Sequence, residues 1–151
     1  MGMIFQIHSR KGYRRNERKM DENTVLPLIN STFEPGHALE KAESFKDKNF
    51  RDIALAELYY FSGEAQKCSD LVEIYLMSPK LELQLSACML YVYSNLTLGN
   101  ARASRRGLDT IRECVKKEFA SPHRKSIRHI AYLQDIWEQC FFICRQTVCR
   151  I

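Results

Sequence analysis

Two glycines, Gly63 and Gly99, lie 36 residues apart, and each follows one apolar helical pattern and precedes another. Glycine is a turn signal between helices because it adopts backbone conformations that other residues avoid. A unit of helix, turn and helix that recurs every 20 to 50 residues or so is typical of stacked helical hairpins, since one hairpin cannot bury its own apolar face. The sequence therefore predicts an all-α fold of five to six helices, stacked as antiparallel hairpins.

Apolar residues at helical spacing give the expected bounds of each helix. After an irregular lead-in over 23–36, we expect a short helix over 37–48 that Asn49 closes, followed by helices over about 51–62, 64–77, 81–98 and 101–119, and a last helix that begins near Ser121. The run 81–98 is apolar on nearly every side, which is typical of a helix at the centre of a stack. Its side chains, including Leu85, Cys88 and Val92, should be buried.

The formal charge of +5 is distributed unevenly along the chain. Residues 1–19 hold six basic residues and one acidic residue, 20–101 hold six and twelve, and 102–129 hold nine and three. Blocks of like charge are normally unstructured, so we expect residues 1–22 to form a disordered basic extension, with Met20 as a second candidate start beside Met1. Residues 23–151 should then form one helical-repeat domain, a length that supports a single core.

A basic face is the one candidate binding surface that the sequence offers. Its members fall mostly three or four residues apart, opposite an apolar stripe: Arg102, Arg105, Arg106, Arg112, Lys116 and Lys117. One interpretation is a solvated helix face without a ligand. The other is a patch that binds phosphate groups or an acidic partner.

The sequence contains no recognisable catalytic or cofactor-binding motif, so we predict that the protein is not an enzyme and holds no cofactor or metal. The glycines of the helical body are all interpreted as turn glycines. Cys68, Cys88 and Cys114 are expected in the core, and Cys140, Cys144 and Cys149 lack the further ligands that a metal site needs. Aromatic residues at helical spacing are interpreted as packing: Tyr59, Tyr60, Tyr75, Tyr91, Tyr93 and Trp137.

Membrane and secreted classes are disfavoured by hydropathy and charge order. No stretch approaches the roughly 18 uncharged apolar residues that a membrane span requires. The basic residues of the amino-terminal region follow its apolar residues, the reverse of a secretory signal. We therefore expect a cytoplasmic protein without membrane contact.

Residues 49–79 resemble a tetratricopeptide hairpin in their Leu55-Ala56 pair, Tyr59, the turn at Gly63, the small Cys68 and the closing Pro79. More specifically, residues 52–63, Leu85-Ser86-Ala87-Cys88 and Asn95-Leu96-Thr97-Leu98-Gly99 resemble the helical-repeat region of bacterial LuxR-type transcriptional regulators. The resemblance covers about residues 23–120. In that family a helix-turn-helix domain that reads DNA follows the repeats, and residues 122–151 do not resemble one. The resemblance implies a role in sensing or in protein contact.

The expected function is thus a non-catalytic protein-interaction or sensory module related to a bacterial transcriptional regulator. The alternative is weak nucleic-acid binding through the basic amino-terminal arm and the face from Arg102 to Lys117. A small-molecule pocket inside the stack is a third class. The expected partner is a protein, and the apolar segment 137–151 makes a second copy of the chain one candidate.

Overall fold

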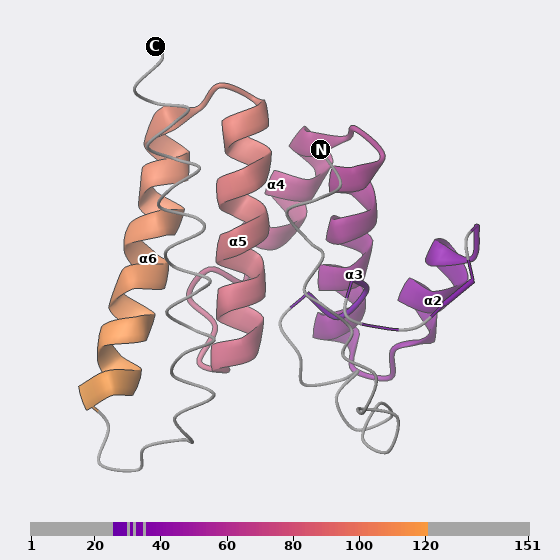
Figure 1. The fold of residues 1–151 in the computed structure, drawn as a ribbon, viewed down its shortest axis with the longest axis horizontal. Helices are drawn as coiled ribbons and strands as arrows, with labels where there is room; N and C mark the ends of the chain where they lie inside the picture. Colours follow the sequence, from indigo (N-terminus) through magenta and orange to yellow (C-terminus); the bar gives the residue numbers. More distant parts are fainter. Residues whose placement is uncertain (1–25, 30, 32, 35, 121–151) are drawn as a thin grey trace.

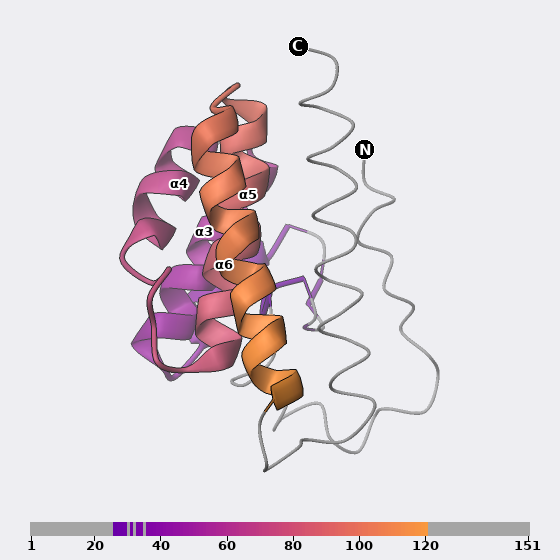
Figure 2. The ribbon, with the colours of Figure 1, turned by 90° about the vertical axis from the view of Figure 1, so that its left-hand side faces the viewer.

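A computed structural model describes residues 26–29, 31, 33, 34 and 36–120 of the chain. Five helices occupy this part: α2 (Ala38–Ser44), α3 (Lys48–Phe61), α4 (Ala65–Glu73), α5 (Leu81–Thr97) and α6 (Ala101–Ala120). Each helix packs on the next along the chain, and α3 also packs on α5. The helices form a stack with α6 at one end and α2 at the other (Figure 1), and α4 lies to one side of α5 (Figure 2). No strand occurs among the described residues, so the predicted all-α hairpin stack is confirmed.

Both predicted turn glycines end their helices with the same hydrogen-bond pattern. Gly63 and Gly99 have φ values of 83° and 74°, a left-handed conformation that glycine adopts without a steric penalty. At the first turn the Glu64 amide donates to the Tyr59 carbonyl over 2.8 Å, and at the second the Asn100 amide donates to the Asn95 carbonyl over 2.8 Å. These bonds satisfy carbonyls that the helix ends would otherwise leave without a partner.

Helix α5 is the centre of the core. Twelve of its residues are buried, Leu85, Cys88 and Val92 among them, because α3, α4 and α6 cover it from different sides. The buried polar Asn95 of α5 donates through its amide nitrogen to the Ser69 hydroxyl of α4 over 2.9 Å. The predicted central position of this helix is therefore confirmed.

The prediction that Asn49 closes the first helix is wrong. Helix α2 ends at Ser44, and Asn49 lies in the first turn of α3. The Asp47 carboxylate accepts hydrogen bonds from the backbone amides of Asn49 and Phe50 over 2.8 and 3.2 Å, and so fixes the start of α3 at Lys48.

Helix α4 is also shorter than the predicted 64–77, because regular helix stops at Glu73. The chain continues in tighter turns, in which the Tyr75 amide donates to the Val72 carbonyl over 2.9 Å. Tyr75 is buried there, and its hydroxyl donates to the Asp52 carboxylate of α3 over 2.5 Å. This bond ties the connection between α4 and α5 to α3.

The lead-in is held on the stack by a buried carboxyl group that the sequence analysis did not single out. Glu57 of α3 is fully buried, and its two carboxyl oxygens accept the backbone amides of Leu28 and Ile29 over 2.9 and 2.8 Å. The Leu26 amide donates to the Ser86 hydroxyl of α5 over 3.2 Å. Burial raises the pKa of Glu57 to about 8, against the opposing effect of the two amide donors.

Two predicted segments, the extension over 1–22 and the helix that begins near Ser121, lie outside the described residues. The same holds for the remainder of the predicted domain beyond Ala120. Among the described helices, none combines the length and apolar character that crossing a membrane requires.

Replacing Leu85 with alanine should lower the free energy of unfolding by about 2–5 kcal/mol, because the side chain is buried and its loss leaves a cavity in α5. Arg105→Ala, on an exposed position of α6, should be nearly neutral. Urea denaturation followed by circular dichroism measures both. Equal losses from the two variants would contradict this assignment of buried and exposed faces.

Stability should also fall as pH rises from about 4.5 to about 8. Over that range the Glu57 carboxyl keeps its proton in the folded state and has released it in the unfolded state. Because the folded state binds more protons, the free energy of unfolding decreases as pH rises. The Glu57→Gln variant cannot titrate, and its stability should depend less steeply on pH. Denaturation of both proteins at pH 5 and pH 8 measures the difference, and parallel pH profiles would contradict the prediction.

Candidate docking groove on α6

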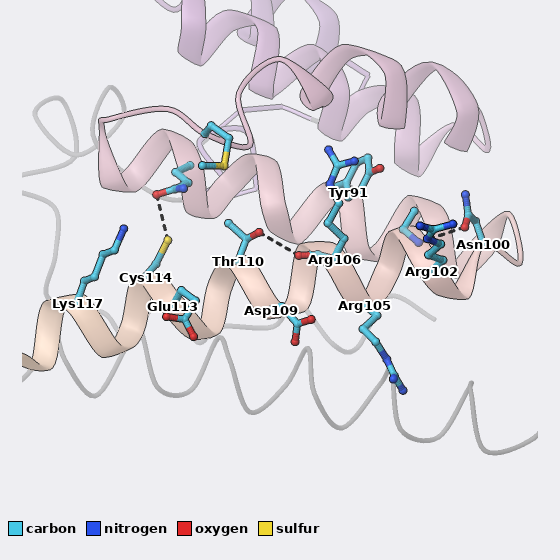
Figure 3. Close-up of a pocket in the computed structure, with 13 residues that line it drawn as sticks. Tyr91, Asn100, Arg102, Arg105, Arg106, Asp109, Thr110, Glu113, Cys114 and Lys117 are labelled. Carbon is cyan, nitrogen blue, oxygen red and sulfur yellow. Dashed lines mark hydrogen bonds between the residues drawn. The ribbon is translucent and has the colours of Figure 1, made fainter.

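An open groove of about 910 Å³ runs along α6, and we refer to it as the α6 groove. Helix α6 supplies most of its lining (Figure 3). Gln84 and Tyr91 of α5 also line it, and the highly exposed Met77 of the α4–α5 connection contributes to its rim. The groove lies along the contact between α6 and α5, and no residue of α4 lines it.

Gly107 allows α6 to approach α5 closely beside the groove. A Cβ atom at this position would lie 2.8 Å from Cγ2 of Val92 and 3.2 Å from Cδ1 of Tyr91, both closer than normal contact. The interpretation of all helical-body glycines as turn glycines is thus wrong for Gly107, which lies inside α6. The sequence signal for this close packing was a glycine inside a strongly amphipathic helical pattern.

Arg106 lines the α6 groove and contacts residues of both α5 and α4. Its guanidinium lies 5.5 Å from the centre of the Tyr91 ring, and one of its nitrogens lies 3.6 Å from the Glu73 carboxylate of α4. Both partners of this ion pair are more than half exposed, at 59% and 54%. An exposed pair of this kind contributes little to stability, so its two members remain available to other partners.

All six basic residues predicted as a face are exposed on α6, but the structure divides them. Four line the α6 groove: Arg102, Arg105, Arg106 and Lys117. Arg112 and Lys116 do not line it, and Lys116 pairs with Glu113 over 3.3 Å. Among the described residues, no carboxylate lies within ion-pair distance of Arg102, Arg105 or Lys117.

The basic face also contains two acidic residues that the sequence analysis passed over. Asp109 and Glu113 line the α6 groove between the arginines near the start of α6 and Lys117 near its end. Figure 3 shows Arg106, Thr110 and Cys114 directed toward α5, whereas Arg105 and Asp109 point away from it. The positive charge of the groove is therefore concentrated toward its two ends.

The exposed apolar side chain of Met77 lines the α6 groove together with the cations. Met77, which forms the rim, is 82% exposed, and Ile74 in the same connection is 72% exposed. Large apolar side chains at this exposure are common singly, but here one of them borders a groove. The α6 groove thus combines an apolar edge with cations.

The thiols of the described residues belong to the core, as predicted. Cys68, Cys88 and Cys114 are buried and not bonded to one another. Burial raises the pKa of the Cys68 thiol to about 12, which keeps it protonated and a poor nucleophile. Cys114 lies at the inner side of the α6 groove and contacts Oε1 of Gln84 over 3.0 Å.

The aromatic residues also serve mainly as packing, with one exception. Tyr75, Tyr91 and Tyr93 are buried, and Tyr59 and Tyr60 pack against the core. Tyr91 additionally lines the α6 groove. Trp137 lies outside the described residues, as do the three cysteines Cys140, Cys144 and Cys149.

Comparisons with protein-family models, with curated proteins and with solved structures found no match to this chain.

Replacing Gly107 with alanine should destabilise the protein by about 1–2 kcal/mol, although alanine is the better helix former, because the new methyl group overlaps Val92. The same change in a Val92→Ala background should cost less, since Cγ2 is then absent. Thermal unfolding of the four proteins in this double-mutant cycle measures the coupling. Additive effects would contradict the close contact between α6 and α5.

Proposed function

We propose that this protein is a non-catalytic protein-interaction or sensory module, related to the helical-repeat region of LuxR-type regulators, and that it binds its partner in the α6 groove. The observation that carries the proposal is the juxtaposition, along one open groove, of exposed Met77 with cations that have no carboxylate within ion-pair distance in the described part of the chain. Protein partners are commonly anchored by a large side chain placed among polar contacts. The cytoplasmic location remains a prediction from the sequence.

Binding is favoured over catalysis by the character of the groove. Six of its thirteen lining residues are exposed charged residues, and its one thiol, Cys114, is buried against Gln84. Reactive cysteines normally lie in accessible, electropositive surroundings that lower the thiol pKa. The buried Glu57 carboxyl lies on α3 and contacts the lead-in.

Nucleic-acid binding, the alternative drawn from the sequence, is less well supported by this surface. A phosphate backbone presents closely spaced negative charges and favours an unbroken basic track. Asp109 and Glu113 interrupt the cations along α6. The basic arm that the sequence also offers lies outside the described residues.

Selection of random peptides of about twelve residues on the intact protein tests the proposal. Thr110→Trp fills the α6 groove from a partly exposed position, and Arg112→Trp places the same bulk on α6 outside the groove. Selected peptides should bind the unmodified protein and Arg112→Trp equally, and bind Thr110→Trp at least about tenfold more weakly. Fluorescence anisotropy with labelled peptides gives these affinities.

The proposal fails if no selected peptide depends on the groove, meaning that Thr110→Trp and Arg112→Trp bind all of them alike. Circular dichroism and thermal unfolding of both variants establish that they are folded before their affinities are compared.

A further inference from the structure

We propose that the partner of the α6 groove is an acidic peptide segment that carries a large apolar side chain, and that Glu73 competes with this segment for Arg106. This inference rests on the proposed function and specifies the chemistry of the partner. Three observations lead to it: cations in the groove that have no carboxylate within ion-pair distance among the described residues, the exposed Met77 at its rim, and the exposed ion pair between Arg106 of the groove and Glu73.

Charge complementarity favours an acidic partner. Four cations and two carboxylates line the α6 groove, and Arg102, Arg105 and Lys117 have no carboxylate within ion-pair distance among the described residues. From Arg102 to Lys117 the helix rises by about 22 Å. An extended segment of about seven residues covers that length, so its carboxylates can reach the cations at both ends.

The acidic pair inside the groove restricts where the partner's charges can lie. Asp109 and Glu113 are placed between the two groups of cations, so a carboxylate opposite them would be repelled. Glu113 is partly compensated by Lys116 over 3.3 Å. The partner should therefore carry its negative charges near its two ends, with neutral or basic residues between them.

The apolar part of the partner is expected beside Met77. This side chain is 82% exposed at the rim, and Tyr91 lies at the inner side of the groove. A large aliphatic or aromatic side chain placed between them would remove apolar surface of both partners from water.

Arg106 is the residue through which Glu73 acts on binding. Its guanidinium lies over the Tyr91 ring and is paired with Glu73 over 3.6 Å. Since this pair is exposed on both sides, a carboxylate of the bound segment can replace Glu73 at small cost and form a two-pronged contact with the guanidinium. Removal of the Glu73 charge should then strengthen binding, whereas removal of the Arg106 charge should weaken it.

The test uses the random-peptide selection on the full chain, with sequencing of the selected peptides. They should be enriched in Asp and Glu toward their ends and in one large apolar residue. Glu73→Gln should bind them about two- to fivefold more tightly, and Arg106→Gln about tenfold more weakly. Arg112→Gln, which removes the same charge from α6 outside the groove, is the matched control and should change the affinity less than Arg106→Gln does. The affinities should fall as salt is raised from 50 to 500 mM.

Other outcomes separate the two proposals. Peptides that are blocked by Thr110→Trp but are neutral or basic would leave the proposed function in place and overturn the acidic partner. Acidic peptides whose affinity is the same for Glu73→Gln and the unmodified protein would overturn the competition. Self-association in sedimentation velocity that Thr110→Trp abolishes would assign the groove to a second copy of the chain, and this too would overturn the inference.

Discussion

The enclosure of α5 is the constraint on which the remaining structure depends. This helix is apolar on nearly all of its sides, so it is stable only when α3, α4 and α6 cover it at once. No hairpin taken alone could do so. The left-handed turn at Gly63 folds α4 back along α3, the turn at Gly99 folds α6 back along α5, and Gly107 lets α6 lie close to α5. The α6 groove lies along the contact between α6 and α5.

Much of this architecture could be predicted from local sequence patterns. The turns at Gly63 and Gly99 depend on backbone conformation alone. The apolar pattern of α5 reflects burial on nearly all sides, and that of α6 reflects burial of one face. Both kinds of information lie within short stretches of sequence. The helix bounds near Asp47 and Glu73 were harder to predict from the sequence. The first depends on whether the Asp47 side chain caps the helix, and the second on where regular helix gives way to tighter turns.

The residues that sequence reasoning missed have a common property. Glu57, Gly107 and Asp109 derive their roles from neighbours that are remote in sequence or from their place on a face. In the sequence Glu57 looks like an ordinary polar residue of a helix. Its role comes from the lead-in, where the backbone amides of Leu28 and Ile29 donate hydrogen bonds to its carboxyl group. The six basic residues of α6 were found by their spacing, but which of them line the groove depends on the position of Met77 and of α5. The spacing of residues along the sequence does not show which of them line the groove.

The attachment of the lead-in has a consequence for the order in which the chain folds. The hydrogen bond between Leu26 and Ser86 joins residues 60 positions apart, whereas each glycine turn joins neighbours. Closing so long a loop costs more entropy than forming a hairpin, so we expect the hairpins to form before the lead-in docks. During synthesis the lead-in leaves the ribosome before the helices do, yet its hydrogen bond to Ser86 forms only when α5 has emerged. Until then Leu26, which the folded protein buries in the cluster around α5, lacks the core against which it packs, so its side chain stays exposed in the nascent chain.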